Sequence, residues 1–174
     1  MKNQKVSTFT NLIYILLGLV VFVQMSVIVG LSLMFLGVCS FGYHYHNQKN
    51  RTWQKFDVYA MFAVFYSIMH YHLDSGVVEG IFLAIALGVV IWHERHFHSF
   101  LFLPVLFFLT SAIIFYQTTL WLHIPFFIVA LLFNIRFMMK VEMDTLNDIL
   151  HGCWHILTAF GFYMMIASKT IILF

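Results

Sequence analysis

The chain has 174 residues, of which 62% are hydrophobic and 9% are charged, and its formal net charge is +2. A soluble domain carries about 25% charged residues, so this chain has too little polar surface to cover a water-soluble globule. The mean hydropathy of +0.91 predicts an integral membrane protein that crosses the bilayer several times. No basic stripe suggests binding to nucleic acid. Cys39 and Cys153 are too few for a disulfide framework, and we interpret them as buried thiols within apolar segments.

The first apolar run covers residues 9–46. It is far longer than the apolar region of a signal peptide, which has about 7–15 residues, and it lacks a convincing small-residue cleavage site. We therefore expect it to stay in the membrane. Because one membrane helix needs about 20 residues, the run should hold two helices joined by a tight turn near Gln24–Ser26.

Polar breaks divide the rest of the chain into five further helices. A polar loop over Asn47–Gln54 precedes a third helix predicted over Lys55–Tyr71. The remaining helices are predicted over residues 77–92, 97–115, 120–138 and 149–174, with breaks at residues 72–76, 93–96, 117–119 and 140–148. Pro104 and Pro125 fall inside predicted helices, where neighbouring helices compensate for them. The expected fold is one all-α domain over residues 1–174 with seven transmembrane helices.

The distribution of Lys and Arg predicts the orientation of these helices. Seven spans place the N-terminus and the loops after the second, fourth and sixth helices on one side of the membrane. That side receives eight of the nine Lys and Arg residues, namely Lys2, Lys5, Lys49, Arg51, Lys55, Arg95, Arg136 and Lys140. Only Lys169 falls on the other side. By the positive-inside rule, the N-terminus is expected to be cytoplasmic.

The stretch His151-Gly152-Cys153-Trp154-His155 opens the last apolar segment. Side chains four residues apart share one face of a helix, so both imidazoles reach a single metal ion. Ionisable side chains at membrane depth are costly and usually functional. Ser40 and His44 show the same spacing near the end of the second predicted helix.

The predicted topology brings these residues together. The second helix ends, and the third and seventh begin, on the same side of the membrane. At a rise of about 1.5 Å per residue, five side chains should lie within roughly 10 Å of one membrane edge: Ser40, His44, Asp57, His151 and His155. Three histidines with an open fourth position are typical of catalytic zinc. Asp57 suits the role of taking a proton from a zinc-bound water, and Ser40 that of orienting it.

Together, the Ser40-x3-His44 motif, Asp57 and the His151-x3-His155 motif resemble the three signatures of the CREST superfamily. That superfamily includes the alkaline ceramidases, the adiponectin/progestin receptors, the GPI-remodelling membrane lipases and the myomaker-like proteins. The resemblance implies seven helices and a Zn²⁺ cofactor held by the three histidines. It also implies that Asp57 and Ser40 contact the zinc-bound water, and that the reaction hydrolyses an amide or ester bond of a membrane lipid.

The N-terminal segment departs from the ceramidase branch of that superfamily. Its first ten residues contain no Asp or Glu, so the acidic, tryptophan-bearing N-terminal calcium site of the ceramidases is missing. Ceramide is therefore not favoured as the substrate. The compact chain and the Trp154-His155 pair are closer to the myomaker-like and GPI-lipase branches.

Two alternatives to a hydrolase stay open. One is a non-enzymatic membrane scaffold or remodelling protein whose zinc ties the second helix to the seventh. The other is a haem or di-iron membrane protein, although di-iron lipid hydroxylases need denser histidine runs on one side. Here the ten histidines divide between the two sides of the membrane.

Several polar residues outside this group are expected to have lesser roles. Asp148 either hydrogen-bonds the free nitrogen of His151 or caps the start of the last helix. His46 is expected to point to the headgroups, and His123 to lie at the opposite interface. His70 and His72 end the third helix on that opposite side, and His93, His96 and His98 form an interfacial cluster.

Overall fold

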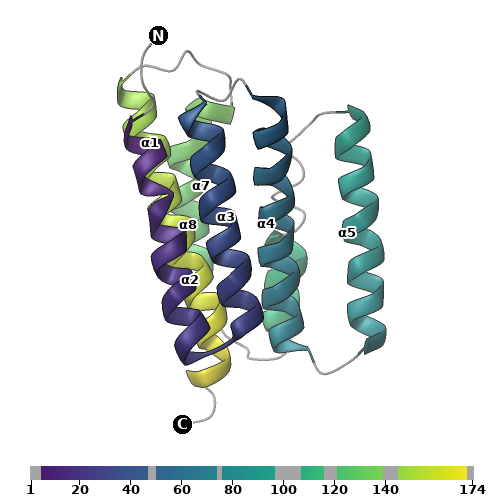
Figure 1. The fold of residues 1–174 in the computed structure, drawn as a ribbon. Coiled ribbons are helices and arrows are strands. Elements are labelled where there is room, and N and C mark those ends of the chain that lie inside the picture. The colour runs from purple at the N-terminus through teal and green to yellow at the C-terminus, as the bar shows by residue number, and fades with distance from the viewer. Residues whose placement is uncertain are drawn as a thin grey trace.

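The computed structural model describes residues 5–46, 50–73, 76–96, 107–115, 121–138 and 145–171, and every regular element among them is a helix. The labelled helices are α1 (Lys5–Thr10), α2 (Leu12–Gln24), α3 (Val27–Tyr45), α4 (Arg51–His72), α5 (Gly76–His96), α7 (Ile124–Met138) and α8 (Thr145–Ile171). Residues 107–115 are also helical. The helices lie side by side, and the two termini lie at opposite ends of the molecule (Figure 1). The predicted all-α class is confirmed.

The first hairpin follows the predicted boundaries closely. α1 and α2 together form one apolar span, Lys5–Gln24. The turn into α3 uses Met25 and Ser26, and the Ser26 hydroxyl accepts a hydrogen bond from the backbone N–H of Val29 at 3.4 Å. α2 and α3 approach closely at Gly18, where a Cβ atom would lie 2.8 Å from the carbonyl oxygen of Gly30. Small residues of this kind let apolar helices pack backbone to backbone.

α4 begins earlier than predicted because Asn50 caps it. Its side-chain oxygen accepts hydrogen bonds from the backbone N–H groups of Thr52 at 3.0 Å and Trp53 at 3.2 Å. An Asn at this position satisfies N–H groups that otherwise have no helical partner. The predicted loop over Asn47–Gln54 is therefore wrong for residues 51–54, and residues 47–49 lie outside the described part of the chain.

Two predicted breaks are also helical. α5 continues to His96, so the histidine-rich residues 93–96 do not interrupt it. α8 begins at Thr145, so residues 145–148 of the predicted charged break belong to its first turn. In both places a charged stretch is compatible with helix, because polar side chains at a helix end reach solvent without breaking the backbone pattern.

α7 begins at Ile124, whereas the sequence predicted a start at residue 120. Residues 121–123 form a turn instead, in which the backbone N–H of Ile124 donates a hydrogen bond to the carbonyl oxygen of Trp121 at 3.1 Å. Pro125 therefore lies in the first turn of α7 rather than in a helix interior. A missing N–H has no consequence there, because first-turn N–H groups have no acceptor in the helix. Pro104 and the predicted break at residues 117–119 lie outside the described residues.

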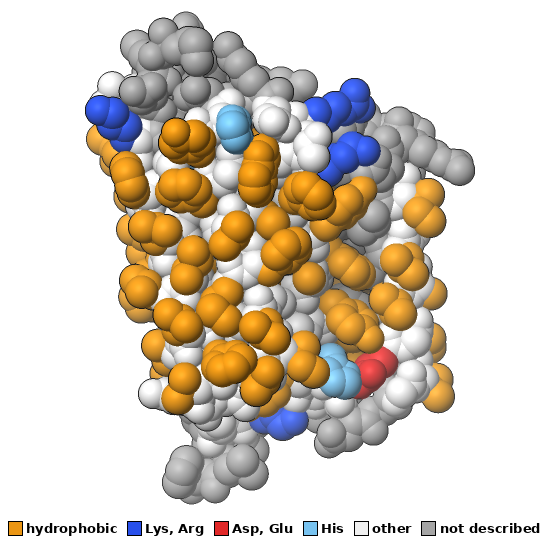
Figure 2. Space-filling view, in the orientation of Figure 1, with side chains coloured by type: hydrophobic (Ala, Val, Ile, Leu, Met, Phe, Trp, Pro, Cys, Tyr) orange, Lys and Arg blue, Asp and Glu red, His pale blue; other side chains and the backbone are white. Residues whose placement is uncertain are grey.

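The described surface is that of a membrane protein. Three helical spans are long and apolar enough to cross a membrane: Lys5–Gln24, Val27–Tyr45 and Thr145–Thr170. Figure 2 shows hydrophobic side chains spread over the middle of the visible face, with Lys and Arg side chains at its two ends. The core between the helices is also apolar and includes the fully buried Leu33, Ile68 and Phe162. Apolar side chains thus occupy both the inside and the outside of the bundle.

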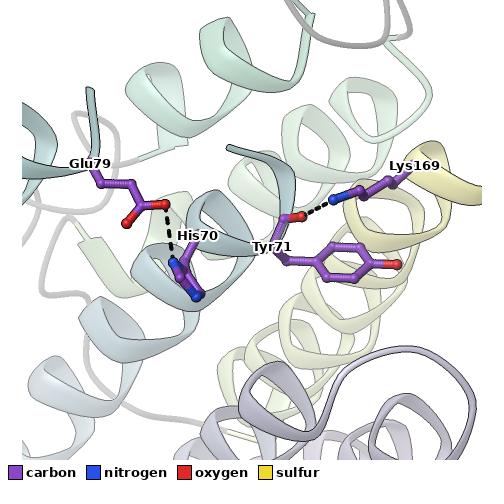
Figure 3. Close-up of polar contacts among 4 residues, drawn as sticks. All are labelled: His70, Tyr71, Glu79 and Lys169. Atoms are coloured by element: carbon purple, nitrogen blue, oxygen red, sulfur yellow. Dashed lines mark hydrogen bonds and ion pairs between the residues drawn. The ribbon is translucent and has the colours of Figure 1, made fainter. Parts of the chain in front are cut away.

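The end of the bundle near the C-terminus is joined by polar contacts of α4 (Figure 3). The Nδ1 atom of His70 lies 3.1 Å from a carboxylate oxygen of Glu79 in α5. The ammonium group of Lys169 in α8 donates to the carbonyl oxygen of Tyr71 and lies 4.8 Å from the centre of its ring. These contacts fix the end of α4 against α5 and α8.

Candidate metal centre

Three histidines from two helices meet at one point inside the bundle. His44 lies in the last turn of α3, and His151 and His155 lie on one face of α8. All three are buried, with exposed fractions of 2% or less. One ring nitrogen from each lies within 4.8 Å of the others, and the Nε2 atoms of His44 and His151 are 3.2 Å apart. The structure thus brings together three imidazoles that the sequence predicted to lie on one side of the membrane.

The spacing of these nitrogens suits a zinc ion. Two nitrogen ligands bound at about 2.0–2.1 Å in tetrahedral geometry lie about 3.3 Å from each other. The 3.2 Å between Nε2 of His44 and Nε2 of His151 is close to that value. The three ring centroids are 4.7–5.0 Å apart. A small movement of the His155 ring would therefore bring all three nitrogens within reach of one ion.

His155 shows which of its nitrogens faces the centre. Its Nδ1 atom lies 3.2 Å from the hydroxyl of Thr10, whereas its Nε2 atom is buried without a hydrogen-bond partner. A buried polar atom with no partner is unfavourable, by about 1–3 kcal/mol. A cation bound between the three rings would satisfy this atom, so the donor set fits a metal ion.

Aromatic rings hold the imidazoles in place. The indole of Trp154 stacks on His151 with centroids 5.1 Å apart and an interplanar angle of 20°. Tyr14 of α2 packs against His155 at 6.0 Å. Its hydroxyl is buried and hydrogen-bonds the hydroxyl of Thr158, one turn further along α8. These contacts limit ring rotation, which favours a preorganised site.

Asp57 and Ser40 form a pair at the end of the bundle where α3 ends and α4 begins, one helical turn before His44. The hydroxyl of Ser40 donates a hydrogen bond to the carboxylate of Asp57, which brings the start of α4 against α3 one turn before His44. Ser40 is buried, and the Oδ1 atom of Asp57 is buried without a hydrogen-bond partner. The pair therefore presents an unsatisfied carboxylate oxygen at the same end of the bundle as the three histidines.

Asp148 lies in the first turn of α8, as predicted, but its hydrogen bonds go to another helix. Its carboxylate accepts hydrogen bonds from the backbone N–H groups of Val6 at 2.9 Å and Ser7 at 3.0 Å, and from the Ser7 hydroxyl at 2.5 Å. Asp148 thus caps the start of α1, a different helix, rather than bonding to His151 or capping α8. It also interacts electrostatically with His44.

Sequence reasoning did not identify Ser7 and Thr10 as neighbours of the site. The one signal in the sequence was Gly152, beside His151, because a small residue on a helix face permits close approach of another helix. A Cβ atom at Gly152 would lie 2.8 Å from Cγ1 of Val6 and 3.3 Å from Oγ1 of Thr10.

The other histidines whose side chains the structure describes lie away from the centre. His46 is exposed at the end of α3 and stacks on Trp53, with centroids 6.2 Å apart. His72 is buried at the opposite end of the bundle, where its Nε2 atom lies 2.8 Å from the carbonyl oxygen of Met165. His123 lies just before α7, and its ring is fully buried and lies 3.0 Å from the hydroxyl of Ser111, so it is not exposed at the surface of the protein. The side chains of the predicted cluster at residues 93, 96 and 98 lie outside the described part of the chain.

Comparison of the chain with protein-family models, with curated proteins and with solved structures found no match. The resemblance to the CREST superfamily stays a prediction based on the motifs. The chemistry of the site is therefore argued from its geometry.

Proposed function

We propose that this chain is a multi-pass integral membrane hydrolase that uses zinc to cleave an amide or ester bond of a membrane lipid. The observation that carries the proposal is the convergence of His44, His151 and His155 inside an apolar bundle, with Nε2 of His155 buried and unpartnered. Such a cluster is unfavourable without a cation, because apolar packing of the same volume would be more stable.

The proposed orientation has seven spans and a cytoplasmic N-terminus. The position of the termini at opposite ends of the molecule agrees with an odd number of spans (Figure 1). Lys5, Arg51 and Lys55 begin the helices that start at one end, whereas Lys169 closes α8 at the other. This asymmetry supports a metal centre near the cytoplasmic face.

The chain's own residues divide the chemistry between them. A zinc ion held by the three histidines would supply a Lewis acid and would lower the pKa of a bound water to about 7. Asp57 offers its unpartnered Oδ1 as the proton acceptor, and Ser40 holds the carboxylate in place by donating to it. Burial of the three rings excludes bulk water and strengthens these interactions.

A lipid is the substrate class that suits this position. The metal centre lies inside a bundle whose described outer face is apolar (Figure 2). Lipids in the bilayer reach such a bundle sideways, between helices, without first crossing an aqueous phase. The acyl chain is then expected to stay among apolar side chains while its amide or ester carbonyl meets the polar pair.

A structural role for zinc is the second candidate. The three histidines come from α3 and α8, so a bound ion would tie these two helices together in a non-enzymatic scaffold. Asp57 separates the two candidates. An enzyme loses turnover with Asp57→Asn yet stays folded and keeps its metal, whereas a scaffold keeps its function.

The deciding experiment measures zinc content and lipid hydrolysis together. Purified protein is assayed for bound zinc and for release of acyl chains from labelled lipid amides and esters in mixed micelles. His155→Ala is expected to lose both, whereas His46→Ala, a matched change of an exposed histidine outside the centre, is expected to lose neither. Zinc-free wild-type protein after zinc reconstitution, or full hydrolysis by His155→Ala, contradicts the proposal.

A further inference from the structure

The N-terminal helix α1 is bound to the same face of α8 that carries the metal centre. Asp148, His151 and His155 are spaced by three and four residues, so they share one face of that helix. The carboxylate of Asp148 accepts three hydrogen bonds from the start of α1, two from backbone N–H groups and one from a hydroxyl. This fixes the position of α1 along α8, because charge-assisted hydrogen bonds of this type are short and directional.

The anchored helix places Thr10 beside His155. Gly152 provides the necessary space, since a Cβ atom there would lie 2.8 Å from Val6 and 3.3 Å from the Thr10 hydroxyl. The Thr10 hydroxyl lies 3.2 Å from Nδ1 of His155. The same ring forms a hydrogen bond with the backbone of Ser7. The hydroxyl of Thr10 in α1 therefore meets Nδ1 of His155, the ring nitrogen other than the unpartnered Nε2.

The hydrogen bonds of Thr10 fix the direction of this contact. The hydroxyl of Thr10 has one hydrogen, and two backbone carbonyl oxygens lie within its reach, that of Val6 at 2.9 Å and that of Ser7 at 3.1 Å. With that hydrogen on either carbonyl, the hydroxyl oxygen accepts a hydrogen bond from His155, and Nδ1 carries the proton. The lone pair of the neutral ring is then on Nε2, the buried atom without a partner. Ligand histidines in metal sites are oriented in this way by a partner on their other nitrogen.

We propose that Thr10 is a positioning residue that sets the tautomer and orientation of His155 for metal binding, and that the Asp148 cap of α1 holds Thr10 in place. This inference rests on the proposed function only in requiring a metal at the three histidines. It adds that the metal centre needs residues from the first turns of the chain as well as from α3 and α8.

The test compares Thr10→Val with Thr10→Ser in the full-length protein. Valine keeps the shape of threonine and removes the hydroxyl, whereas serine keeps it. Thr170→Val is the matched control, because Thr170 also donates to a helical carbonyl, that of Ala167 at 2.7 Å, at the far end of α8. Zinc affinity is measured by competition with a chromophoric chelator, and the ligand field by the visible spectrum of the cobalt-loaded protein.

Thr10→Val is expected to bind zinc about 10- to 100-fold more weakly and to shift the cobalt spectrum, since loss of a partner outside the ligand set has effects of that size. Thr10→Ser should restore most of the affinity, and Thr170→Val should match the wild type. Wild-type affinity in folded Thr10→Val overturns the inference, as does a wild-type protein that binds neither metal.

A measurement on the wild type covers the case in which Thr10→Val does not fold. Nitrogen-15 spectra of metal-free protein labelled at histidine, assigned with His155→Gln, should show His155 protonated at Nδ1. Protonation at Nε2 overturns the inference. A protein that meets these expectations but hydrolyses no lipid contradicts the proposed hydrolase alone, so the two failures are distinguishable.

Discussion

Nε2 of His44 and Nε2 of His151 lie 3.2 Å apart, although 107 positions separate the two residues in the sequence. Nε2 of His155 is the third nitrogen of this group and has no hydrogen-bond partner. A single proton between two of the rings leaves the third unsatisfied in an apolar interior. A bound cation satisfies all three, and the predictions below follow from that requirement.

Loss of any one of the three imidazoles should release the metal. His151→Ala removes the ring that is nearest His44 and leaves two nitrogens for the ion. Zinc affinity is expected to fall by more than the roughly 100-fold typical of partners outside the ligand set. Competition with a chelator measures this loss, and His46→Ala serves as its control. Retention of one tightly bound zinc by His151→Ala would show that the metal lies elsewhere.

Asp57→Asn should separate binding from turnover. The amide keeps the shape of the carboxylate and its contact with Ser40, but it no longer accepts a proton. Hydrolysis is expected to fall about 100- to 10,000-fold, the usual contribution of a positioned acid or base. Zinc content and the thermal midpoint should stay near those of the wild type. Unchanged hydrolysis would remove Asp57 from the reaction.

Asp148→Ala should destabilise the protein through α1. It leaves the backbone N–H groups of Val6 and Ser7 without their acceptor. The free energy of unfolding is expected to fall by about 3 kcal/mol, since hydrogen bonds to a charged group are worth about 1.5–3 kcal/mol each and are not fully additive. Denaturant titration in mild detergent measures the change.

Glu79→Ala is the matched control for that change. Glu79 of α5 contacts the ring of His70 in α4. This ring is exposed, so solvent screens the interaction. Its removal should alter stability by less than about 1 kcal/mol. Equal losses of unfolding free energy in Asp148→Ala and Glu79→Ala would show that the cap of α1 stabilises the protein no more than an exposed contact does.

Gly152→Ala should separate α1 from α8. The added methyl group would lie 2.8 Å from Cγ1 of Val6, which forces one helix to move. We expect a loss of about 1–3 kcal/mol, as for other overpacked sites, together with weaker zinc binding. Gly80→Ala in α5 is the control, because nothing lies within 4 Å of a Cβ atom there. A neutral Gly152→Ala variant would contradict the close packing of the two helices.

The proposed orientation is testable by labelling from one side of the membrane. Single cysteines are introduced as Lys2→Cys or Leu173→Cys, in a background with both natural cysteines replaced. A membrane-impermeant maleimide applied to intact cells should label only the C-terminal position. Labelling of both positions, or of Lys2→Cys alone, would exclude seven spans with a cytoplasmic N-terminus.

The fold features that could be predicted from the sequence are those set by local patterns. The turn at Met25 and Ser26 follows from the length of the apolar run, and the shared face of His151 and His155 follows from their spacing. The early start of α4 was also predictable, because Asn50 is a favoured capping residue. Other helix ends were misplaced where charged residues continued a helix, as in α5 and α8, or where a turn delayed its start, as in α7.

The contacts that could not be predicted are those between distant segments. Nothing in the sequence around Asp148 indicates that its partner is the start of α1, because the pairing depends on how α1 lies against α8. The burial of His123 likewise depends on the segment at residues 107–115 that covers it. Convergence of the three histidines was predictable only because the predicted topology placed the end of α3 beside the start of α8.

The most direct test of the central claim is anomalous scattering at the zinc absorption edge from crystals of zinc-reconstituted protein. One peak is expected between the three rings, with His44, His151 and His155 each placing a nitrogen about 2.0–2.1 Å from it. A map without a peak at that point, or with zinc bound by other residues, would contradict the account.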